Sequence, residues 1–346
     1  MRPGKLIGIS AVVITLICLG FFLKFHNEKT FSAARQLMLI SFGKELFNDA
    51  TLSADSRTRC ASCHQPDHDY TDGKSVAIGV FGRIGTRNTP SLAGIGVDTD
   101  SPLFWDGRRS SLQQAVLDPL TNPFEMGMPN QEEVLHRVMQ SAKYREEFKQ
   151  LSQGRNITPN INDIALALTA YIRSLNEQNS AYDRYAYGDK SALSGLAQSG
   201  LAIFKGKGQC AECHRLNGSP AALTDHDFHR SGVGMDDVLQ KLPELTTEVI
   251  ERSLQGADIG NRVAAHADEA ALGRFNVTKD PTDIGLFRTP SLRNVSHTAP
   301  YMHDGSINTL DDAIDREAYY RGLQAGRPLN LSIEDRRALK AFLLTL

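Results

Sequence analysis

The sequence has few cysteines, a single tryptophan and no long run of lysine or arginine. Of its 346 residues five are cysteine, and the net charge at pH 7 is −2. A basic stripe for binding nucleic acid is therefore absent. Four cysteines beyond residue 30 are too few for a scaffold that disulfides hold together. Strand-like alternation is also sparse, so the composition favours a mainly helical protein, and the length favours two domains.

The first 30 residues have the pattern of a targeting segment. Arg2 and Lys5 precede an apolar run over residues 6–23, and Lys24 follows it. Basic flanks around such a run direct a chain into or across a membrane. We expect an exported, periplasmic protein that residues 1–30 anchor in the inner membrane. Cleavage after the segment TFSAA is the alternative.

The remaining cysteines form two copies of the motif C-x-x-C-H. Their cysteines and histidines are Cys60, Cys63, His64, Cys210, Cys213 and His214. Two thiols at this spacing add to the two vinyl groups of one haem, and the adjacent imidazole binds the iron. The pattern predicts two covalently bound c-type haems with His64 and His214 as proximal ligands. A zinc site shared by both pairs, a disulfide framework and a thioredoxin-like dithiol are the alternatives.

Helical periodicity surrounds both motifs. Apolar residues recur at helical spacing over residues 37–49 and 199–210, just before each motif, which indicates a duplicated domain start. Glycine and proline break the chain into loops from the first motif to about residue 110. The polar, aperiodic stretch 176–194 predicts the domain boundary. We expect an N-terminal haem domain over residues 31–185 and a C-terminal haem domain over residues 186–346.

Three later segments predict helices with recognisable starts. Asn130 is the expected N-cap of one helix, with Glu133 at its third position. Residues 160–175 are strongly periodic, and the last helix begins with the capping pair Ser332 and Asp335. The apolar face of that last helix comprises Ala338, Leu339, Phe342 and Leu343. The fold class is therefore mainly α, with two haem-bearing domains.

Six stretches around the two motifs are similar to one known family. They are CASCHQPDHDYTDG, RNTPSL, LFWDGRRSSL, DPLTNPFEMG, FRTPSLRNVSHTAPYMHDGS and YYRG. Their order and spacing resemble the bacterial di-haem cytochrome c peroxidases, including the MauG-type enzymes, from about residue 36 to the end of the chain. The resemblance implies two cytochrome c-like domains with the haems near their interface.

The resemblance also implies how the N-terminal haem reacts. Trp105 would lie between the haems and relay electrons, and Glu125 would overhang the open face of the N-terminal haem. Cleavage of the O–O bond of hydrogen peroxide needs a group that moves a proton from one oxygen to the other. Pro119 fits the distal wall. Where MauG-type proteins carry a pocket glutamine this chain has Ala115, with glutamines at 113–114 beside it.

The two haems would differ in their sixth ligands. Between His68 and His136 there is no histidine, and we interpret His68 as a turn residue, so the N-terminal haem is expected to be five-coordinate. The last methionine is Met302, so the methionine ligand of ordinary peroxidases is missing. The resemblance instead places Tyr319 at the tyrosine ligand of MauG-type proteins, with two residues inserted before it, and leaves Tyr320 as the alternative.

A calcium site and a propionate contact are implied in the same way. Asn88 and the backbone oxygens of Thr298 and Pro300 correspond to a calcium site between the haems, and such oxygens suit a hard cation. His303 would lie near a haem propionate.

These features together predict an exported di-haem oxidoreductase that reacts with hydrogen peroxide at the N-terminal haem. Electrons would reach that haem from the C-terminal haem through Trp105. The donor would be a small redox protein, either a cytochrome c or a cupredoxin. A MauG-like oxidase that modifies a side chain of a partner protein is the alternative. A membrane-anchored electron-transfer cytochrome without catalysis is the alternative of another class.

Overall fold

The computed structural model describes most of the chain. The described residues are 32–95, 101–152, 158–175, 179–218 and 220–346. The targeting segment expected over residues 1–30 lies outside them. No helix within the described ranges is both long and apolar enough to span a bilayer.

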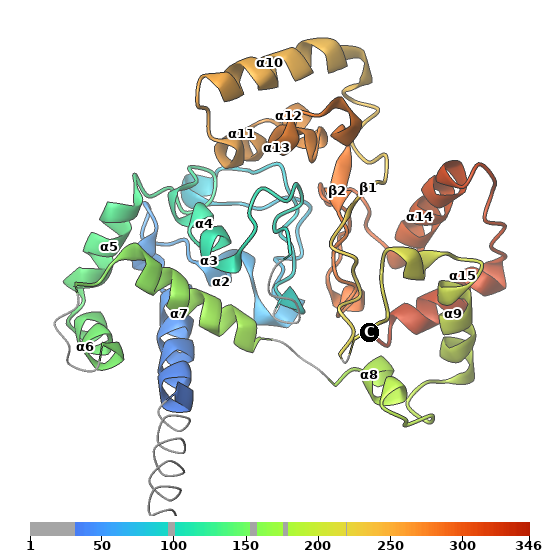
Figure 1. Cartoon of the computed structure of the whole chain (residues 1–346), viewed down its shortest axis with the longest axis horizontal. Helices are drawn as coiled ribbons and strands as arrows, with labels where there is room; N and C mark the ends of the chain where they lie inside the picture. Colours follow the sequence, from blue (N-terminus) through green and yellow to red (C-terminus); the bar gives the residue numbers. More distant parts are fainter. Residues whose placement is uncertain (1–31, 96–100, 153–157, 176–178, 219) are drawn as a thin grey trace, which may run out of the picture.

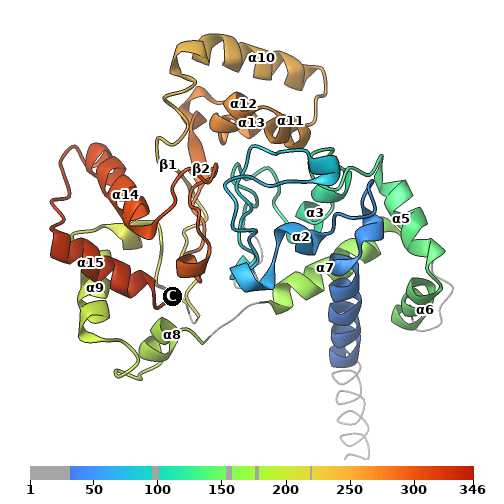
Figure 2. The ribbon, with the colours of Figure 1, turned by 180° about the vertical axis from the view of Figure 1, so that it is seen from behind.

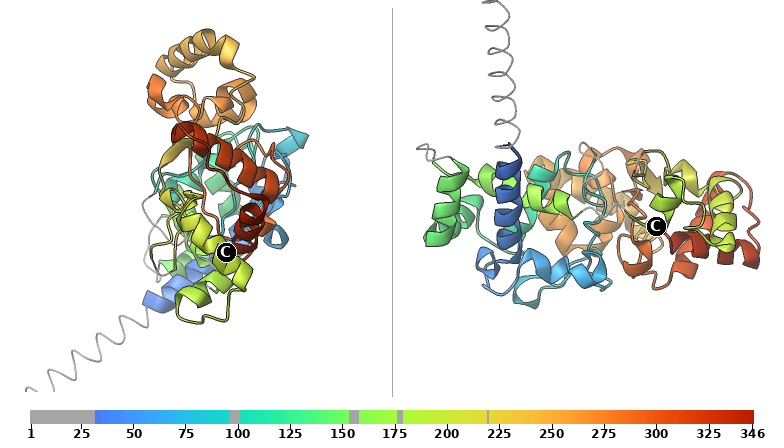
Figure 3. Two further views of the ribbon diagram at one scale, coloured as in Figure 1. Left: turned by 90° about the vertical axis from the view of Figure 1, so that its right-hand side faces the viewer. Right: turned by 90° about the horizontal axis from the view of Figure 1, so that it is seen from below.

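Two hydrophobic cores organise the fold, one in each half of the chain (Figure 1). The first draws on residues from Leu39 to Ile172, and the second on residues from Tyr182 to Leu346. Helices supply both cores, and the described part holds a single two-stranded sheet. The view from below places the two cores side by side (Figure 3). The expected mainly α class is therefore confirmed.

A helix over residues 32–48 and helix α7 (Ile161–Ser174) form the centre of the first core. Around them lie α3 (Leu112–Ala115), α5 (Gln131–Gln140) and α6 (Ala142–Leu151). The expected cap of α5 is present. The side chain at position 130 accepts a hydrogen bond from the N–H three residues on, at 2.8 Å.

The second core is centred on α9 (Gly195–Lys205) and α15 (Ile333–Leu343), with α14 (Leu310–Gln324) packed on α15. Helix α8 (Ala181–Ala186) belongs to this core, because the ring of its Tyr182 lies 5.5 Å from that of a phenylalanine of α15. The boundary expected after residue 185 therefore cuts through α8, and the division between the cores precedes it. Serine at the start of α15 forms the expected capping box.

The two helix crossings are built alike around a glycine. A Cβ on Gly43 would lie 1.9 Å from the carbonyl oxygen of Ala167 in α7, and one on Gly200 would lie 1.9 Å from that of Ala338 in α15. Only glycine lets the backbones approach so closely. This correspondence agrees with the duplicated start predicted from the sequence.

An aromatic pair completes each crossing. Phe47 packs against Tyr171, and Phe204 packs against Phe342, each with ring centroids 5.1 Å apart and the ring planes at 64°. In both cases the first residue lies four positions after the glycine, so it projects from the same helical face. In each half a C-x-x-C-H motif follows the crossing along the chain.

A four-helix insertion, which the sequence did not indicate as a separate unit, separates strands β1 (Phe228–Arg230) and β2 (Leu286–Arg288). Its helices are α10 (Leu242–Leu254), α11 (Ile259–Ala265), α12 (Ala267–Ala271) and α13 (Phe275–Thr278). The strands pair antiparallel with Phe228 opposite Arg288. The insertion has a small core of its own and lies above the two halves (Figure 2).

Short elements fill the rest of the described chain. They are α2 (Cys60–Cys63), α4 (Asp118–Thr121), η1 (Ala50–Leu52), η2 (Pro66–His68), η3 (Val80–Gly82), η5 (Cys210–Glu212), η6 (Leu239–Lys241), η7 (Pro281–Asp283) and η8 (Val295–His297). The described residues between α2 and α3 are mostly loop, as the glycines and prolines there predict.

Candidate haem sites

The first C-x-x-C-H motif opens onto a cavity of about 200 Å³. Helix α2 brings Cys60 and Cys63 to its wall, and His64 caps the helix. The Nδ1 of His64 donates to the carbonyl oxygen of Tyr70 at 2.8 Å, which leaves Nε2 as the ring nitrogen for an iron. Burial lowers the pKa of His64, so the imidazole is neutral, as a metal ligand must be.

The second motif repeats this arrangement at a cavity of about 260 Å³. Cys210, Cys213 and His214 line it, and the Nδ1 of His214 donates to the carbonyl oxygen of Leu223 at 3.1 Å. Burial lowers the pKa of His214 to about 4. Both imidazoles are therefore neutral and are oriented in the same way.

The four cysteines are not arranged for zinc, for disulfides or for dithiol chemistry. The two pairs line different cavities, and the four described cysteines are free thiols. A shared zinc site and a disulfide framework are thereby excluded. Burial raises the pKa of Cys60, Cys63 and Cys210 to about 12 and that of Cys213 to about 11. A reactive dithiol needs a lowered pKa instead.

Trp105 lies between the cavities and lines both of them. Its Nε1–H donates to the carbonyl oxygen of Asn88 at 2.9 Å, and its own carbonyl oxygen accepts the N–H of Arg288 at 2.8 Å. Asn88 and Arg288 also line both cavities. The indole is thus fixed at the point where the two sites meet.

Buried polar atoms without a partner lie at the walls near this point. Arg87 donates Nη2 to the carbonyl oxygen of Ala270 at 2.7 Å, but its Nε and Nη1 have no partner among the described residues. Burial lowers the pKa of Arg87 to about 10, which leaves it charged at neutral pH. Carboxylates of a bound group, such as haem propionates, would satisfy these two donors. His303 donates Nε2 to the carbonyl oxygen of Val233 at 3.2 Å, and burial lowers its pKa to about 3, so the ring is neutral and its unpaired Nδ1 is an acceptor.

Glu125 is the one carboxylate among the described residues that line the first cavity. A turn after α4 places it, since its N–H donates to the carbonyl oxygen of Asn122 at 3.0 Å. The side-chain N–H of Asn122 donates to Glu125 Oε1 at 2.9 Å. Burial raises the pKa of Glu125 to about 7, against the opposing charge of Arg108. The carboxyl group can therefore both accept and donate a proton near neutral pH.

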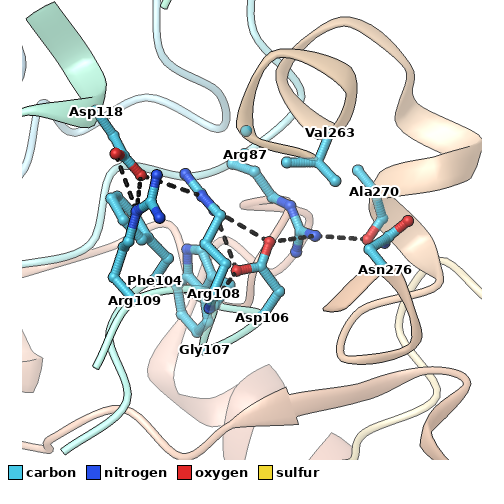
Figure 4. A network of polar contacts seen from close by, with 12 residues as sticks. Arg87, Phe104, Asp106, Gly107, Arg108, Arg109, Asp118, Val263, Ala270 and Asn276 are labelled. Atoms are coloured by element: carbon cyan, nitrogen blue, oxygen red, sulfur yellow. Dashed lines mark hydrogen bonds and ion pairs between the residues drawn. The ribbon is translucent and has the colours of Figure 1, made fainter. Parts of the chain in front are cut away.

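Arg108 holds its position through a polar network (Figure 4). Its Nη1 donates to the fully buried Asp106 at 3.0 Å, and its Nε lies 3.8 Å from Asp118. The guanidinium group stacks 3.6 Å over the ring of Phe104, while the adjacent Arg109 pairs with Asp118 at 2.8 Å. The sequence analysis did not single out Arg108. Its position three residues after the only tryptophan was the available signal.

The other residues expected around the N-terminal haem lie partly on the wall of the first cavity and partly on the surface. Ala115 and Pro119 line the cavity, whereas the glutamines at 113–114 are exposed on the outer surface. Among the described residues His64 is the only histidine on its wall, and His68 is exposed. The cavity thus has neither a pocket amide at this position nor a second imidazole from the described chain.

The insertion supplies one wall of the first cavity, although it belongs to the other half of the chain. Gly260, Val263 and Ala264 line the cavity from α11. The Thr86 hydroxyl donates to the carbonyl oxygen of Val263, and Asn122 Nδ2 approaches that of Gly260 at 3.4 Å. Helix α11 of the insertion therefore forms part of the wall of the first cavity, a role that no sequence motif indicated.

The structure differs from the expectation for Tyr319 and Tyr320. Neither lines the second cavity: Tyr319 is 61% exposed, and the ring of Tyr320 packs near Gly232, with the guanidinium group of Arg316 over it. A different face of helix α14 lines the cavity, and Glu317 lies on that face. The residues of that face are Leu310, Ala313, Ile314, Glu317, Ala318 and Arg321. The tyrosine ligand therefore finds no support in the described wall of the second cavity.

The expected calcium ligands lie close to the meeting point of the cavities. Asn88 is buried, and its Nδ2 donates to the carbonyl oxygen of Lys74 at 2.9 Å, which leaves Oδ1 as its possible ligand atom. Thr298 and Pro300 line the second cavity together with Asn88. Their carbonyl oxygens are of the kind that calcium binds.

Comparison with known proteins agrees with these features. A family described as di-haem cytochrome c peroxidase matches residues 38–191. The cytochrome-c peroxidase IdrP2 of Denitromonas iodatirespirans is 34% identical over 314 residues, which cover 88% of this chain and 80% of that protein. The methylamine utilization protein MauG of Methylorubrum extorquens is 31% identical over 315 residues, 89% of this chain and 77% of that protein. A solved MauG-like protein associated with microbial copper homeostasis superposes with a TM-score of 0.71 at 29% identity, covering 89% of both chains.

Proposed function

The chain belongs to the family of di-haem cytochrome c peroxidases and MauG proteins, and on this premise we propose that it reduces hydrogen peroxide in its N-terminal cavity. Membership implies an oxidoreductase with two c-type haems. It therefore favours an enzyme over the alternative of an electron-transfer cytochrome without catalysis. The proposal rests mainly on the lining of the first cavity. Glu125 is the single carboxylate among its described residues, and Trp105 lines both this cavity and the second one.

The two motifs would hold the haems. Cys60 and Cys63 would bind the first through thioether bonds, and His64 would ligate its iron; the second motif would do the same with its own residues. The bound haem iron supplies the coordination position and the electrons for reduction of the O–O bond. The unpaired donors of Arg87 would bind a propionate, and the expected propionate contact of His303 stays a prediction.

Glu125 would move the proton that the reaction needs. Reduction of one hydrogen peroxide to two waters consumes two electrons and two protons. With a pKa of about 7, the Glu125 carboxylate can take the proton of the nearer peroxide oxygen and return it to the departing oxygen. The hydrogen bond from Asn122 at 2.9 Å holds the carboxylate in place for both transfers.

Trp105 would carry electrons from the second haem to the first. Its indole is fixed by the bond to the carbonyl oxygen of Asn88, and its backbone by the bond from Arg288. A calcium ion on Asn88, Thr298 and Pro300 would hold the same junction together. The ion would then act on electron transfer through the position of Trp105.

Residues 1–30 would export the protein to the periplasm and anchor it in the inner membrane. Covalent haem attachment at two C-x-x-C-H motifs agrees with an exported chain. Small redox proteins of that compartment, a cytochrome c or a cupredoxin, would supply the electrons.

Spectroscopy of the resting protein together with a peroxide assay tests the proposal. The ferric holoprotein should show a high-spin N-terminal haem, because the described first cavity offers no second imidazole. Peroxide should be consumed with matching oxidation of a reduced cytochrome c. Two low-spin haems in the resting protein, or no reduction of peroxide by any donor, would contradict the proposal.

A MauG-like oxidase that modifies a partner protein is the second candidate. The observation in its favour is the same lack of a second histidine on the first cavity, which resembles MauG-type proteins more than ordinary peroxidases. Mixing the peroxide-treated protein with a reduced cytochrome c and, separately, with co-encoded proteins separates the candidates. Fast turnover of the cytochrome favours the peroxidase, and covalent change of a partner, detected by mass spectrometry, favours the oxidase.

A further inference from the structure

Helix α14 presents a carboxylate to the second cavity. Its residues on the wall recur three or four positions apart, which is one face of an α-helix. Glu317 lies in the middle of this face, and no other carboxylate among the described residues lines the cavity. Tyr319, two positions on, is rotated by about 200° from it and is exposed.

The Glu317 carboxylate lacks a partner of its own. It is partly buried, with its remaining surface at the cavity, and it accepts no hydrogen bond from the described residues. Burial raises its pKa, and the nearby charges of Arg321, His229 and Arg316 act in the opposite direction. A carboxylate in an apolar cavity is costly unless another group binds it.

Glu317 also lies near the attachment point of the haem. Burial raises the pKa of the Cys210 thiol, and the charge of Glu317 raises it further. The same charge adds to the shift at Cys213. Since both thiols would be joined to one porphyrin, the carboxylate is close to that porphyrin.

Two other polar side chains of this wall are already engaged. His229 Nε2 lies 2.9 Å from Asp225 Oδ2 and 3.3 Å from Cys213 Sγ. Arg321 donates Nη2 to Cys213 Sγ at 2.8 Å. Met302, His226 and His303 line the cavity as well, and their thioether and imidazole groups are the competing ligands.

We propose, on the basis of the proposed di-haem function, that Glu317 is the second protein ligand to the iron of the C-terminal haem, in addition to His214. The ionised carboxylate would take the coordination position in place of water. An anionic oxygen ligand favours the ferric state, whereas a thioether favours the ferrous state. The C-terminal haem would then have a low reduction potential without a tyrosine ligand.

Spectra of the ferric holoprotein test this assignment without any turnover. Glu317→Gln should change the electron paramagnetic resonance and absorption spectra of the C-terminal haem alone and raise its midpoint potential. Glu317→His should create the low-spin spectrum of an iron with two histidine ligands. The matched controls Tyr319→Phe and Met302→Leu should leave the spectra unchanged. A double Cys210→Ala, Cys213→Ala variant, in which the second haem cannot attach, assigns the signals.

Several results would overturn the assignment. They are a two-histidine or thioether spectrum in the unaltered protein, a changed spectrum in Tyr319→Phe, and an unchanged spectrum in Glu317→His. If Glu317→Gln does not retain haem, the histidine variant decides the question alone. If the protein does not reduce peroxide but its spectrum still depends on Glu317, the proposed function is rejected and the assignment of Glu317 as a ligand stands.

Discussion

The N-terminal and C-terminal halves share a scaffold and differ in the walls of their cavities. Both have a glycine-centred helix crossing and an aromatic pair with the same spacing and angle. Both hold the histidine of the motif by a hydrogen bond from Nδ1 to a backbone carbonyl oxygen. Each described cavity has one carboxylate, Glu125 in the first and Glu317 in the second.

The carboxylates differ in what surrounds them. The side-chain N–H of Asn122 donates to Glu125 and holds it, while burial raises its pKa to about 7 against the opposing charge of Arg108. Glu317 has no hydrogen bond among the described residues, which leaves it free to bind a metal. A duplicated scaffold would thus support proton transfer in one half and ligation in the other, because the turn after α4 and helix α14, rather than the crossing helices, supply the two carboxylates.

Removing the carboxylate of the first cavity gives the largest expected effect. In Glu125→Gln the amide cannot accept the proton of peroxide, and we expect kcat/KM for peroxide to fall by about 10²–10⁴-fold. Steady-state assays with reduced cytochrome c measure the loss, and absorption spectra confirm that both haems are present. Glu132→Gln, on an exposed turn of α5, is the matched control. A loss below about tenfold would show that the first cavity does not depend on this carboxylate.

Adding a methyl group at each crossing tests whether the scaffolds are equivalent. Gly43→Ala and Gly200→Ala would each force a Cβ to 1.9 Å from a carbonyl oxygen, and we expect each to destabilise its half by about 1–3 kcal/mol or more. Denaturant unfolding, followed by circular dichroism and haem absorbance, measures this. Gly195→Ala, where a Cβ meets open space, is the control. If only one of the two substitutions destabilises the protein, the two helix crossings are not equivalent.

The scaffold and the haem motifs could be predicted from the sequence because their signals are local. The cap of Asn130 with Glu133 and the pair Ser332 and Asp335 appear as expected, since capping depends on residues three positions apart. Trp105 could be singled out because it is the only tryptophan of the sequence and lies in a motif that resembles the family, and in the structure it lines both cavities.

The walls of the cavities could not be predicted because they depend on rotation and on distant contacts. Tyr319 follows Glu317 by two positions in the uninterrupted helix α14, so the two side chains are rotated by about 200° from each other and only Glu317 faces the cavity. Val263 lines the first cavity, and its carbonyl oxygen accepts a hydrogen bond from Thr86, which is far from it in the chain. The hydrophobic periodicity of the sequence gives no sign of such a contact. Arg108 acts on Glu125 through space, in a network that only the fold assembles.

Arg108 provides a smaller test of the difference between the cavities. Since its charge lowers the pKa of Glu125, Arg108→Gln should raise that pKa above about 7. The carboxylate form is the proton acceptor, so the rise of kcat/KM with pH should move to higher pH, with a several-fold loss at neutral pH. The pH profile measures this. Arg108→Lys should restore the profile, and exposed Arg57→Gln should not change it. A shift to lower pH would contradict the assigned role.

The caps of α7 and α15 give the smallest effect and the most direct comparison of the two scaffolds. Asn160 accepts the N–H of Asn162 at 2.9 Å, and Ser332 accepts that of Asp335 at 3.2 Å. Asn160→Ala and Ser332→Ala should each cost about 0.5–2 kcal/mol, because each leaves N–H groups of the first helical turn without a side-chain acceptor. Thermal unfolding measures both. Equal costs would mean that the halves share their stability as well as their geometry, so that their chemical difference arises only at the cavity walls.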